Sequence, residues 1–175
     1  MGDFTTADGR HYAWEMARLQ LPRTQGCLVC GSDNPVGLKL TSFVDNATGI
    51  VTADFIPHQH HIGFTGVVHG GALATVLDEI MVWCATWQGK RFCLAAELNI
   101  RYRSPGRVGS LLHIEGRIVT ARSRLITTTG TIHAGGILIC EASGKYMPLP
   151  DPENQAFVAT LVTDPASAEA AGRLA

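Results

Sequence analysis

Residues 69–89 read HGGALATVLDEIMVWCATWQG, and this stretch predicts the one long helix of the chain. Its apolar residues recur at helical spacing, and no proline interrupts the run. We therefore expect a helix from Gly70 to about Gln88, with Gly89 as its stop. The residues of its apolar face are Leu73, Val76, Leu77, Ile80, Cys84 and Trp87.

The segments on both sides of this helix read as β-strands. Before it, residues 38–43 and 49–55 alternate in polarity and are separated by a turn at Asp45-Asn46. After it, four strands are expected over residues 94–102, 111–120, 125–133 and 136–147. One helix cannot cover both faces of a large antiparallel sheet. The order therefore predicts an α+β fold in which a curved antiparallel sheet wraps around one long central helix.

The domain boundaries follow from the same pattern. Residues 1–36 are expected to form an N-terminal helix, over residues 13–21, and a turn-rich connector. Residues 37–147 form the predicted folded domain. Residues 148–175 are a C-terminal tail that either carries a short helix or is disordered.

Composition excludes several classes of protein. The formal net charge of the 175 residues is -1, which provides no basic field for nucleic acid. With 46% hydrophobic and 17% charged residues, the chain is not expected to be disordered. No apolar run is long enough to span a bilayer, and the first twenty residues lack the apolar core of a secretory signal. We expect a cytoplasmic protein with five reduced cysteines and no membrane partner.

The start of the predicted helix, His69-Gly70-Gly71, is a candidate oxyanion hole. The first turn of a helix has free N–H groups and a partial positive charge. Glycines let a ligand oxygen approach these groups closely, as acyl transfer requires. The alternative is that Gly70-Gly71 only forms a tight turn.

Asp78 is the candidate reactive acid. Aspartate has poor helix propensity, and Asp78 lies mid-helix with no Lys or Arg between residues 70 and 88. Its neighbours on the helical wheel are small or apolar: Gly71, Ala74, Val82 and Ala85. Such an acid is either exposed to solvent or placed for chemistry. Glu79, one position further, is read as a solvated side chain or a supporting partner.

The spacing between these two groups predicts a dimer. Gly70 and Asp78 are eight residues apart, which is roughly 12 Å along one helix axis. A reacting carbonyl must approach both groups within about 3 Å. Two antiparallel copies related by a two-fold axis can supply them, with Gly70 of one protomer facing Asp78 of the other.

These residues resemble the hotdog-fold acyl-CoA thioesterase superfamily. The resemblance lies in HGGALATVLDE at 69–79 and LNIRYRSP at 98–105, and it extends over about 37–147. The lead-in segments CLVCG at 27–31 and NPVGL at 34–38 are also similar. The phenylacetate-pathway type and the thioesterase-superfamily-member type are the most alike. The resemblance implies a thioesterase that hydrolyses an acyl-CoA or aryl-CoA, as a homodimer or a dimer of dimers, with coenzyme A only as part of the substrate.

The resemblance also implies roles for individual residues. The Gly70 amide would polarise the thioester carbonyl, and Asp78 would act as general base or as nucleophile. His60 or His61, in the loop before the motif, would hold the carbonyl or the acid. His69 either orients the loop or contacts the thioester. Arginines at strand ends would bind the phosphates of CoA: Arg101, Arg103, Arg107, Arg122 and Arg124.

One position departs from the family pattern. Many relatives have a Ser or Thr seven residues before the strand Tyr, and this chain has Ala95 there. Thr75 or Thr86 would have to compensate. Ala95 therefore favours an alternative reading, a non-catalytic module that binds acyl-CoA. A hotdog dehydratase is a weaker alternative, since its Asp-x-x-x-x-His pattern is absent around the central helix.

Cys27 and Cys30 form a C-x-x-C pair, which suggests either zinc or a redox dithiol. Structural zinc takes four ligands, and no second pair is present. The histidines at positions 58, 60 and 61 would have to complete such a site. We therefore expect no metal.

Overall fold

The computed structural model describes residues 18–162 and 164–174. Its strands before the central helix are β1 (Arg18–Gln20), β2 (Arg23–Thr24), β3 (Ser42–Asp45), β4 (Val51–Phe55), β5 (Ile62–Phe64) and β6 (Val67–Val68), with the 3-10 helix η2 (Gln59–His61) before β5. The central helix is α1 (Gly70–Gly89). After it come β7 (Cys93–Tyr102), β8 (Leu112–Arg122), β9 (Leu125–Ala134), β10 (Ile137–Pro148), α2 (Asp151–Val158), β11 (Leu161–Val162) and α3 (Ala168–Gly172).

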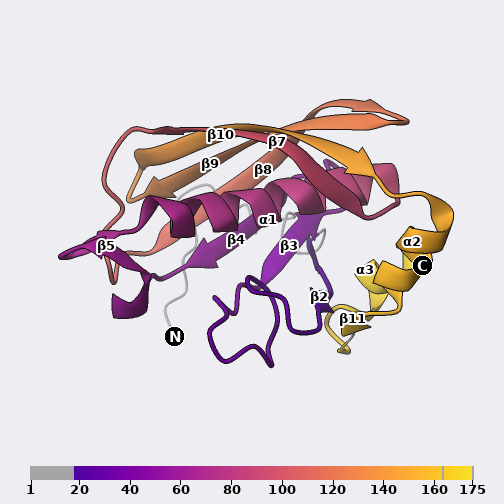
Figure 1. The fold of residues 1–175 in the computed structure, drawn as a ribbon, viewed down its shortest axis with the longest axis horizontal. Coiled ribbons are helices and arrows are strands. Elements are labelled where there is room, and N and C mark those ends of the chain that lie inside the picture. Colours follow the sequence, from indigo (N-terminus) through magenta and orange to yellow (C-terminus); the bar gives the residue numbers. More distant parts are fainter. Residues whose placement is uncertain (1–17, 163, 175) are drawn as a thin grey trace, which may run out of the picture.

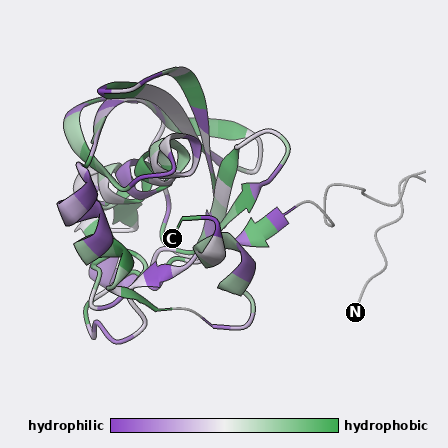
Figure 2. Cartoon of the chain, turned by 90° about the vertical axis from the view of Figure 1, so that its right-hand side faces the viewer, coloured by the Kyte–Doolittle hydropathy of each residue, from purple (hydrophilic) through white to green (hydrophobic). Residues whose placement is uncertain are grey.

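One antiparallel sheet of seven strands, in the order β1-β3-β4-β8-β9-β10-β7, carries the fold. Figures 1 and 2 show this sheet curving over α1. Two small sheets, β2 with β11 and β5 with β6, lie outside it. The predicted α+β arrangement, a curved antiparallel sheet around one long helix, is confirmed.

The core lies between α1 and the concave face of the sheet. Leu73, Val76, Leu77 and Ile80 of α1 are each at most 2% exposed. Gly116 lets α1 approach the sheet closely: a Cβ there would lie 2.9 Å from side-chain atoms of both Cys84 and Ile80. This close packing fixes the depth of the helix against the strands, and hence the position of every side chain on α1.

The predicted elements are largely found. The helix begins at Gly70 as expected and ends at Gly89, and Lys90 rather than Gly89 takes the left-handed conformation that closes it, with φ of 55°. The four strands after the helix are observed within about two residues of their predicted bounds. The expected turn also forms, because the Asp45 carboxylate accepts hydrogen bonds from the amides of Ala47 and Thr48.

Two predictions of local structure are wrong. Of the predicted helix at 13–21, residues 13–17 lie outside the described residues. Residues 18–20 form strand β1, because they pair with β3. The strand expected over 38–43 begins only at Ser42, since Leu38 and Leu40 donate instead to the carbonyls of Leu28 and Val29 in the connector.

The C-terminal segment packs on one end of the molecule (Figure 1). It contains the helices α2 and α3, of which α3 buries Ala170 and Ala171. The Asn154 side chain of α2 accepts a 2.8 Å hydrogen bond from the Phe92 amide, which ties this segment to the start of β7. Among the described residues, no helix is both long and apolar enough to cross a membrane.

Candidate active site

Asp78 lies near the middle of α1 with its side chain half-buried. The Tyr146 hydroxyl of β10 donates a 2.9 Å hydrogen bond to Asp78 Oδ1. Burial raises the pKa of Asp78, and the hydrogen bond from Tyr146 lowers it, with burial the larger effect. Asp78 is therefore a partly desolvated carboxyl group held in one orientation, as a reactive acid requires.

Tyr146 is fully buried, and its place in the sheet explains its direction. Side chains alternate along β10, so Ala142, Gly144 and Tyr146 all face the helix. A Cβ at Gly144 would lie 2.6 Å from Cε2 of Tyr146, so the ring lies where only a glycine leaves room for it. Burial and the neighbouring Asp78 both raise the pKa of the Tyr146 hydroxyl, which keeps it a proton donor to Asp78.

The start of α1 presents a free backbone donor. The Gly71 amide donates to His69 Nδ1 at 2.8 Å, and the amides of Ala72 and Leu73 donate to the His69 carbonyl. The Gly70 amide donates no hydrogen bond to any residue within 18–162 or 164–174. It is thus available to an oxygen of a ligand.

A cleft of about 410 Å³ opens at this helix start, and Gly70 lines it. The other residues of its wall include Phe64, His69, Leu73, Tyr102 and Pro105. The Tyr102 hydroxyl donates a 2.8 Å hydrogen bond to the Gly70 carbonyl, and a Cβ at Gly70 would lie 3.2 Å from that hydroxyl oxygen. Tyr102 thus fixes the peptide next to the free amide, and Gly70 leaves the approach open.

His60 and His61 lie elsewhere. Their side chains line a second hollow beside Pro35–Lys39, not the cleft at Gly70. His61 Nδ1 accepts from the His58 amide, and burial lowers the pKa of His61. What His61 does contribute is its carbonyl, which accepts a 2.7 Å hydrogen bond from the His69 amide. Within one chain, the structure does not bring the His60 and His61 side chains to the thioester position expected for them.

Ala95 faces the same region as Asp78. It pairs directly with Tyr146 across β7 and β10. Neither proposed substitute for a hydroxyl at this position reaches Asp78: Thr75 donates to the Gly71 carbonyl of its own helix, and Thr86 is buried near Cys93. The hydroxyl that does meet Asp78 is that of Tyr146, which sequence reasoning missed. Strand alternation along β10 places Tyr146 on the inner face, but it does not show which residue of α1 the hydroxyl meets.

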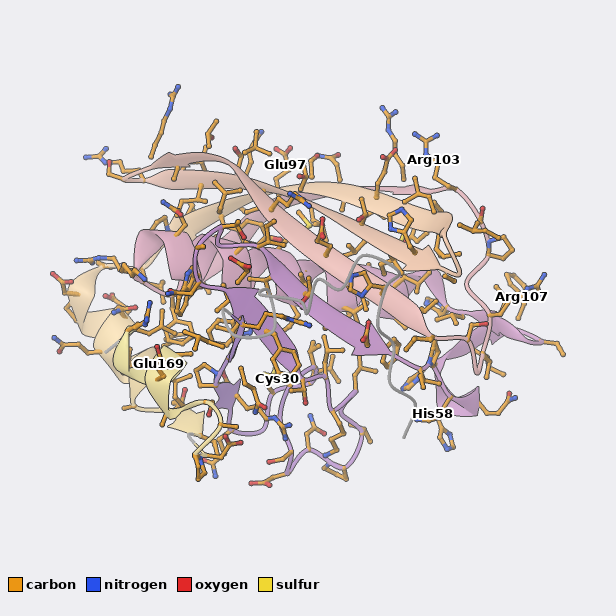
Figure 3. All side chains as sticks on the ribbon, turned by 180° about the vertical axis from the view of Figure 1, so that it is seen from behind. Cys30, His58, Glu97, Arg103, Arg107 and Glu169 are labelled. Atoms are coloured by element: carbon orange, nitrogen blue, oxygen red, sulfur yellow. The ribbon has the colours of Figure 1, made fainter. Side chains whose placement is uncertain are left out.

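Within one chain, the five arginines expected at strand ends do not form one cluster. Arg103 and Arg107 lie toward one end of the molecule (Figure 3), and Arg101 is on the same end of β7. The strand register shows the separation. Tyr102 of β7 pairs with Cys140 of β10, which pairs with Ile132 of β9, which in turn pairs with Ile114 of β8. Arg122 is eight residues beyond Ile114, roughly 25 Å along the strand, and Arg124 adjoins it in the turn.

Arg103 must give up an existing ion pair in order to bind a phosphate group. Its guanidinium forms an ion pair with Glu141 across β7 and β10 at 2.5 Å. Arg101 lines a hollow next to Glu141. The side chains of Arg103 and Glu141 are 48% and 38% exposed, so their ion pair can exchange for another anion at a small cost in free energy.

Glu79 is not the solvated side chain that one reading predicted. It lies next to Cys27 and Cys30 of the connector, and the indole of Trp83, one turn further along α1, donates to it at 2.9 Å. Burial raises the pKa of Glu79 to about 7. Glu79 therefore belongs to a separate cluster with Cys27 and Cys30.

Strand β7 is an exposed edge of the sheet, although Leu98 and Ile100 pack partly against the core. It ends the sheet order, and no residue from Leu94 to Tyr102 is fully buried, although its neighbour β10 alternates between buried and exposed. An edge strand with an unpaired row of backbone groups is a site for pairing with another chain.

The comparisons with known proteins agree with this architecture. Residues 65–141 match the family model described as the thioesterase superfamily. The mouse protein named acyl-coenzyme A thioesterase THEM4 is 32% identical over 120 residues, which is 67% of this chain and 51% of that protein. The chain thus spans about half the length of the curated relatives it matches.

Solved structures give the same answer for the fold. A crystal structure described as a thioesterase superfamily protein superposes with a TM-score of 0.64 at 25% identity, covering 70% of this chain and 60% of that chain. A Streptococcus mutans protein solved bound to acetyl-CoA superposes with a TM-score of 0.56 at 20% identity, covering 59% and 84%. The sheet, the central helix and the site at its start define a hotdog fold. The matched segment, residues 65–141, belongs to the thioesterase superfamily.

Proposed function

We propose that this protein is an acyl-CoA thioesterase that hydrolyses an acyl-CoA or aryl-CoA to the free acid and CoA. Asp78 acts either as a general base that takes a proton from the attacking water, or as a nucleophile whose acyl intermediate water then cleaves. In both routes the carbon–sulfur bond breaks and CoA leaves as a thiolate that takes up a proton. The Gly70 amide stabilises the oxyanion.

The observation that carries this proposal is the pairing of Asp78 with Tyr146. A half-buried carboxyl group, oriented by one buried hydroxyl at 2.9 Å, is not a surface charge. It is costly to desolvate a carboxyl group without a cation, and such cost is typical of functional sites. The free Gly70 amide two helical turns earlier supplies the second group that acyl transfer needs.

The proposal includes a homodimer, because Gly70 and Asp78 of one helix are roughly 12 Å apart along its axis. The open edge strand β7 supports a two-fold contact. Antiparallel pairing of two β7 strands would set the two α1 helices side by side in opposite directions, with Gly70 of each facing Asp78 of the other. Two such dimers can associate further into a tetramer.

The substrate class follows from the cleft and the relatives. The cleft at Gly70 is about 410 Å³ and is walled by Phe64, Leu73 and Tyr102, which suits an apolar acyl or aryl group. The name of the mouse relative and the acetyl-CoA bound to the Streptococcus mutans protein support a CoA thioester. Arg101, Arg103 and Arg107, on the same end of the molecule, are the proposed phosphate contacts.

The test is a measurement of CoA release from a panel of aliphatic and aromatic CoA thioesters by wild-type protein and by Asp78→Asn. We expect turnover by the wild type and a loss of at least about a hundredfold in Asp78→Asn, with the fold retained. Asp54→Asn, which changes an exposed acid paired with His113, is the matched control and should keep its activity. Full activity of Asp78→Asn would overturn the assignment of Asp78.

A second candidate function is an acyl-CoA-binding module without turnover. The observation that favours it is Ala95, which faces the Asp78 region and has no hydroxyl to hold an attacking water. Calorimetric titration with the same CoA thioesters distinguishes the two functions. Tight binding by the wild type without release of CoA from any thioester would favour the binding module.

A further inference from the structure

Two cysteines and a glutamate from separate parts of the chain converge next to α1. The Sγ atoms of Cys27 and Cys30 and a carboxylate oxygen of Glu79 all lie within 4.8 Å of one another. Cys30 is buried, and Cys27 and Glu79 are half-buried. Within residues 18–162 and 164–174, no other group of three or more His, Cys, Asp or Glu side chains converges in this way.

The loop around Cys27 is shaped to hold its sulfur as a thiolate. The amides of Val29 and Cys30 donate to Cys27 Sγ at 3.3 and 3.4 Å. The Gly31 amide closes the turn onto the Cys27 carbonyl at 3.1 Å, and a Cβ at Gly31 would lie only 2.5 Å from the Cys27 amide nitrogen. This tight turn therefore requires glycine, and its two amides point at a metal-ligating atom.

The loop is also fixed from outside. The Lys39 ammonium donates to the carbonyls of Gly31, Ser32 and Asn34. The Leu38 amide donates to the Leu28 carbonyl at 2.8 Å. Because these contacts do not use the thiols, the two sulfur atoms are held close together in advance of any ligand.

Glu79 completes the group from the helix. The Trp83 indole N–H fixes one of its carboxylate oxygens at 2.9 Å. No Lys, Arg or His within the described residues forms an ion pair with this carboxylate. Three acidic groups that share a largely buried space without a cation match the donor set that a divalent metal ion neutralises.

We propose that Cys27, Cys30 and Glu79 bind one thiophilic divalent metal ion, Zn²⁺ being the ion that fits two thiolates and a carboxylate. Binding displaces the thiol protons to solvent, and water occupies the fourth tetrahedral position on the half-exposed side of Cys27. The ion would join the connector loop to the helix that carries Asp78.

This differs from the expectation of no metal, which considered only the C-x-x-C pair and the histidines at positions 58, 60 and 61. The third ligand comes from α1, more than 45 residues further along the chain, and not from the histidines considered with that pair. His58 lies well apart from Cys30 in Figure 3, and no histidine joins the group among the described residues.

The test is a titration of the full-length protein with Co²⁺ alone, after removal of bound metal with a chelator under reducing conditions. We expect one equivalent to bind, with a thiolate-to-cobalt absorption in the near ultraviolet and the visible bands of a tetrahedral site. Zn²⁺ should displace the cobalt and raise the melting temperature. The absence of both absorptions in folded protein would overturn the proposal.

Variants locate the site. Cys27→Ser should abolish the thiolate absorption or weaken Co²⁺ binding at least tenfold, and Glu79→Gln should weaken it about tenfold while keeping a thiolate band. Cys93→Ser, which changes a buried cysteine outside the group, is the matched control. Equal Co²⁺ affinity in Cys27→Ser and the wild type would contradict the assignment.

A measurement on the wild type alone guards against variants that do not fold. Zn²⁺ should protect two thiols from a disulfide-exchange reagent, and a chelator should expose them again. Equal reactivity with and without Zn²⁺ would refute the site. None of these readouts depends on hydrolysis, so the metal site and the thioesterase activity stand or fail separately.

Discussion

The Tyr146 hydroxyl donates a 2.9 Å hydrogen bond to Asp78, and it connects residues 68 positions apart in the sequence. The bond joins β10 to the middle of α1, where the Asp78 side chain is half-buried. It orients the carboxyl group and partly offsets the cost of burying it. In the proposed reaction, this bond holds the base or nucleophile toward the substrate while its second oxygen stays free.

The pH dependence of hydrolysis should reflect Asp78. Only the carboxylate form can act as base or nucleophile, and burial raises the pKa of Asp78 above the usual value for aspartate, about 3.9. Activity should therefore be full at higher pH and be lost as pH falls through that raised pKa. A profile of kcat/KM against pH on one CoA thioester measures this limb, and a limb at or below pH 3.9 would contradict the proposed role.

Tyr146→Phe should move the acidic limb of that profile to higher pH. The hydrogen bond from Tyr146 lowers the pKa of Asp78, so its removal lets the pKa rise further. The variant should lose about 1 kcal/mol of stability, since water reaches the half-buried carboxyl group and replaces part of the bond. The measurement is the pH profile together with chemical unfolding.

Tyr102→Phe is the comparison for that experiment, because Tyr102 bonds to the Gly70 carbonyl and not to Asp78. It should leave the acidic limb where the wild type has it, even if it changes kcat. Identical shifts in both variants would mean that Tyr146 acts only through general packing.

The sequence predicts the fold because its signals are local. The apolar face of α1 repeats within the helix itself, and the strands from β7 to β10 alternate within themselves. Asp78 is recognisable for the same reason, since an unpaired acid on a small-residue stripe is visible within one helix. The role of Tyr146 is not recognisable from the sequence, because its contact with Asp78 depends on which strand faces the middle of the helix.

The other differences between the sequence predictions and the structure also depend on tertiary contacts. Consecutive turns of an antiparallel sheet lie at opposite ends, so Arg122 and Arg124 in the β8–β9 turn are one strand length away from Arg103. A position near the end of a strand does not show at which end of the sheet an arginine lies. The sequence predicts only a solvated or supporting role for Glu79, because Cys27 and Cys30 come next to it only in the folded connector.

Gly70→Ala should lower kcat by roughly a hundredfold to a thousandfold, the effect of losing one oxyanion donor. The added Cβ would lie 3.2 Å from the Tyr102 ring and hydroxyl, so the ring or the helix start must shift and the amide with it. Gly172→Ala in α3 is the matched control, because nothing lies within 4 Å of a Cβ there. Steady-state kinetics on both variants decide the point, and unchanged kcat in Gly70→Ala would show that hydrolysis does not require a glycine at this position.

Mixing two inactive variants tests whether each site is shared between protomers. If Gly70 of one protomer acts with Asp78 of the other, a heterodimer of Gly70→Ala and Asp78→Asn contains one intact site and one site with both changes. Co-expression and purification through two different affinity tags should then give about half of the wild-type activity per dimer, although each parent dimer is nearly inactive.

If instead Gly70 and Asp78 of the same protomer act together, both sites of that heterodimer carry one change and the mixture stays inactive. The mass of the purified species, measured by light scattering, confirms that heterodimers were assayed. An inactive heterodimer of the correct mass would therefore refute the shared site. Half activity would require a contact between copies that brings the helix start of one protomer to the middle of the other helix, which is what the open edge of β7 permits.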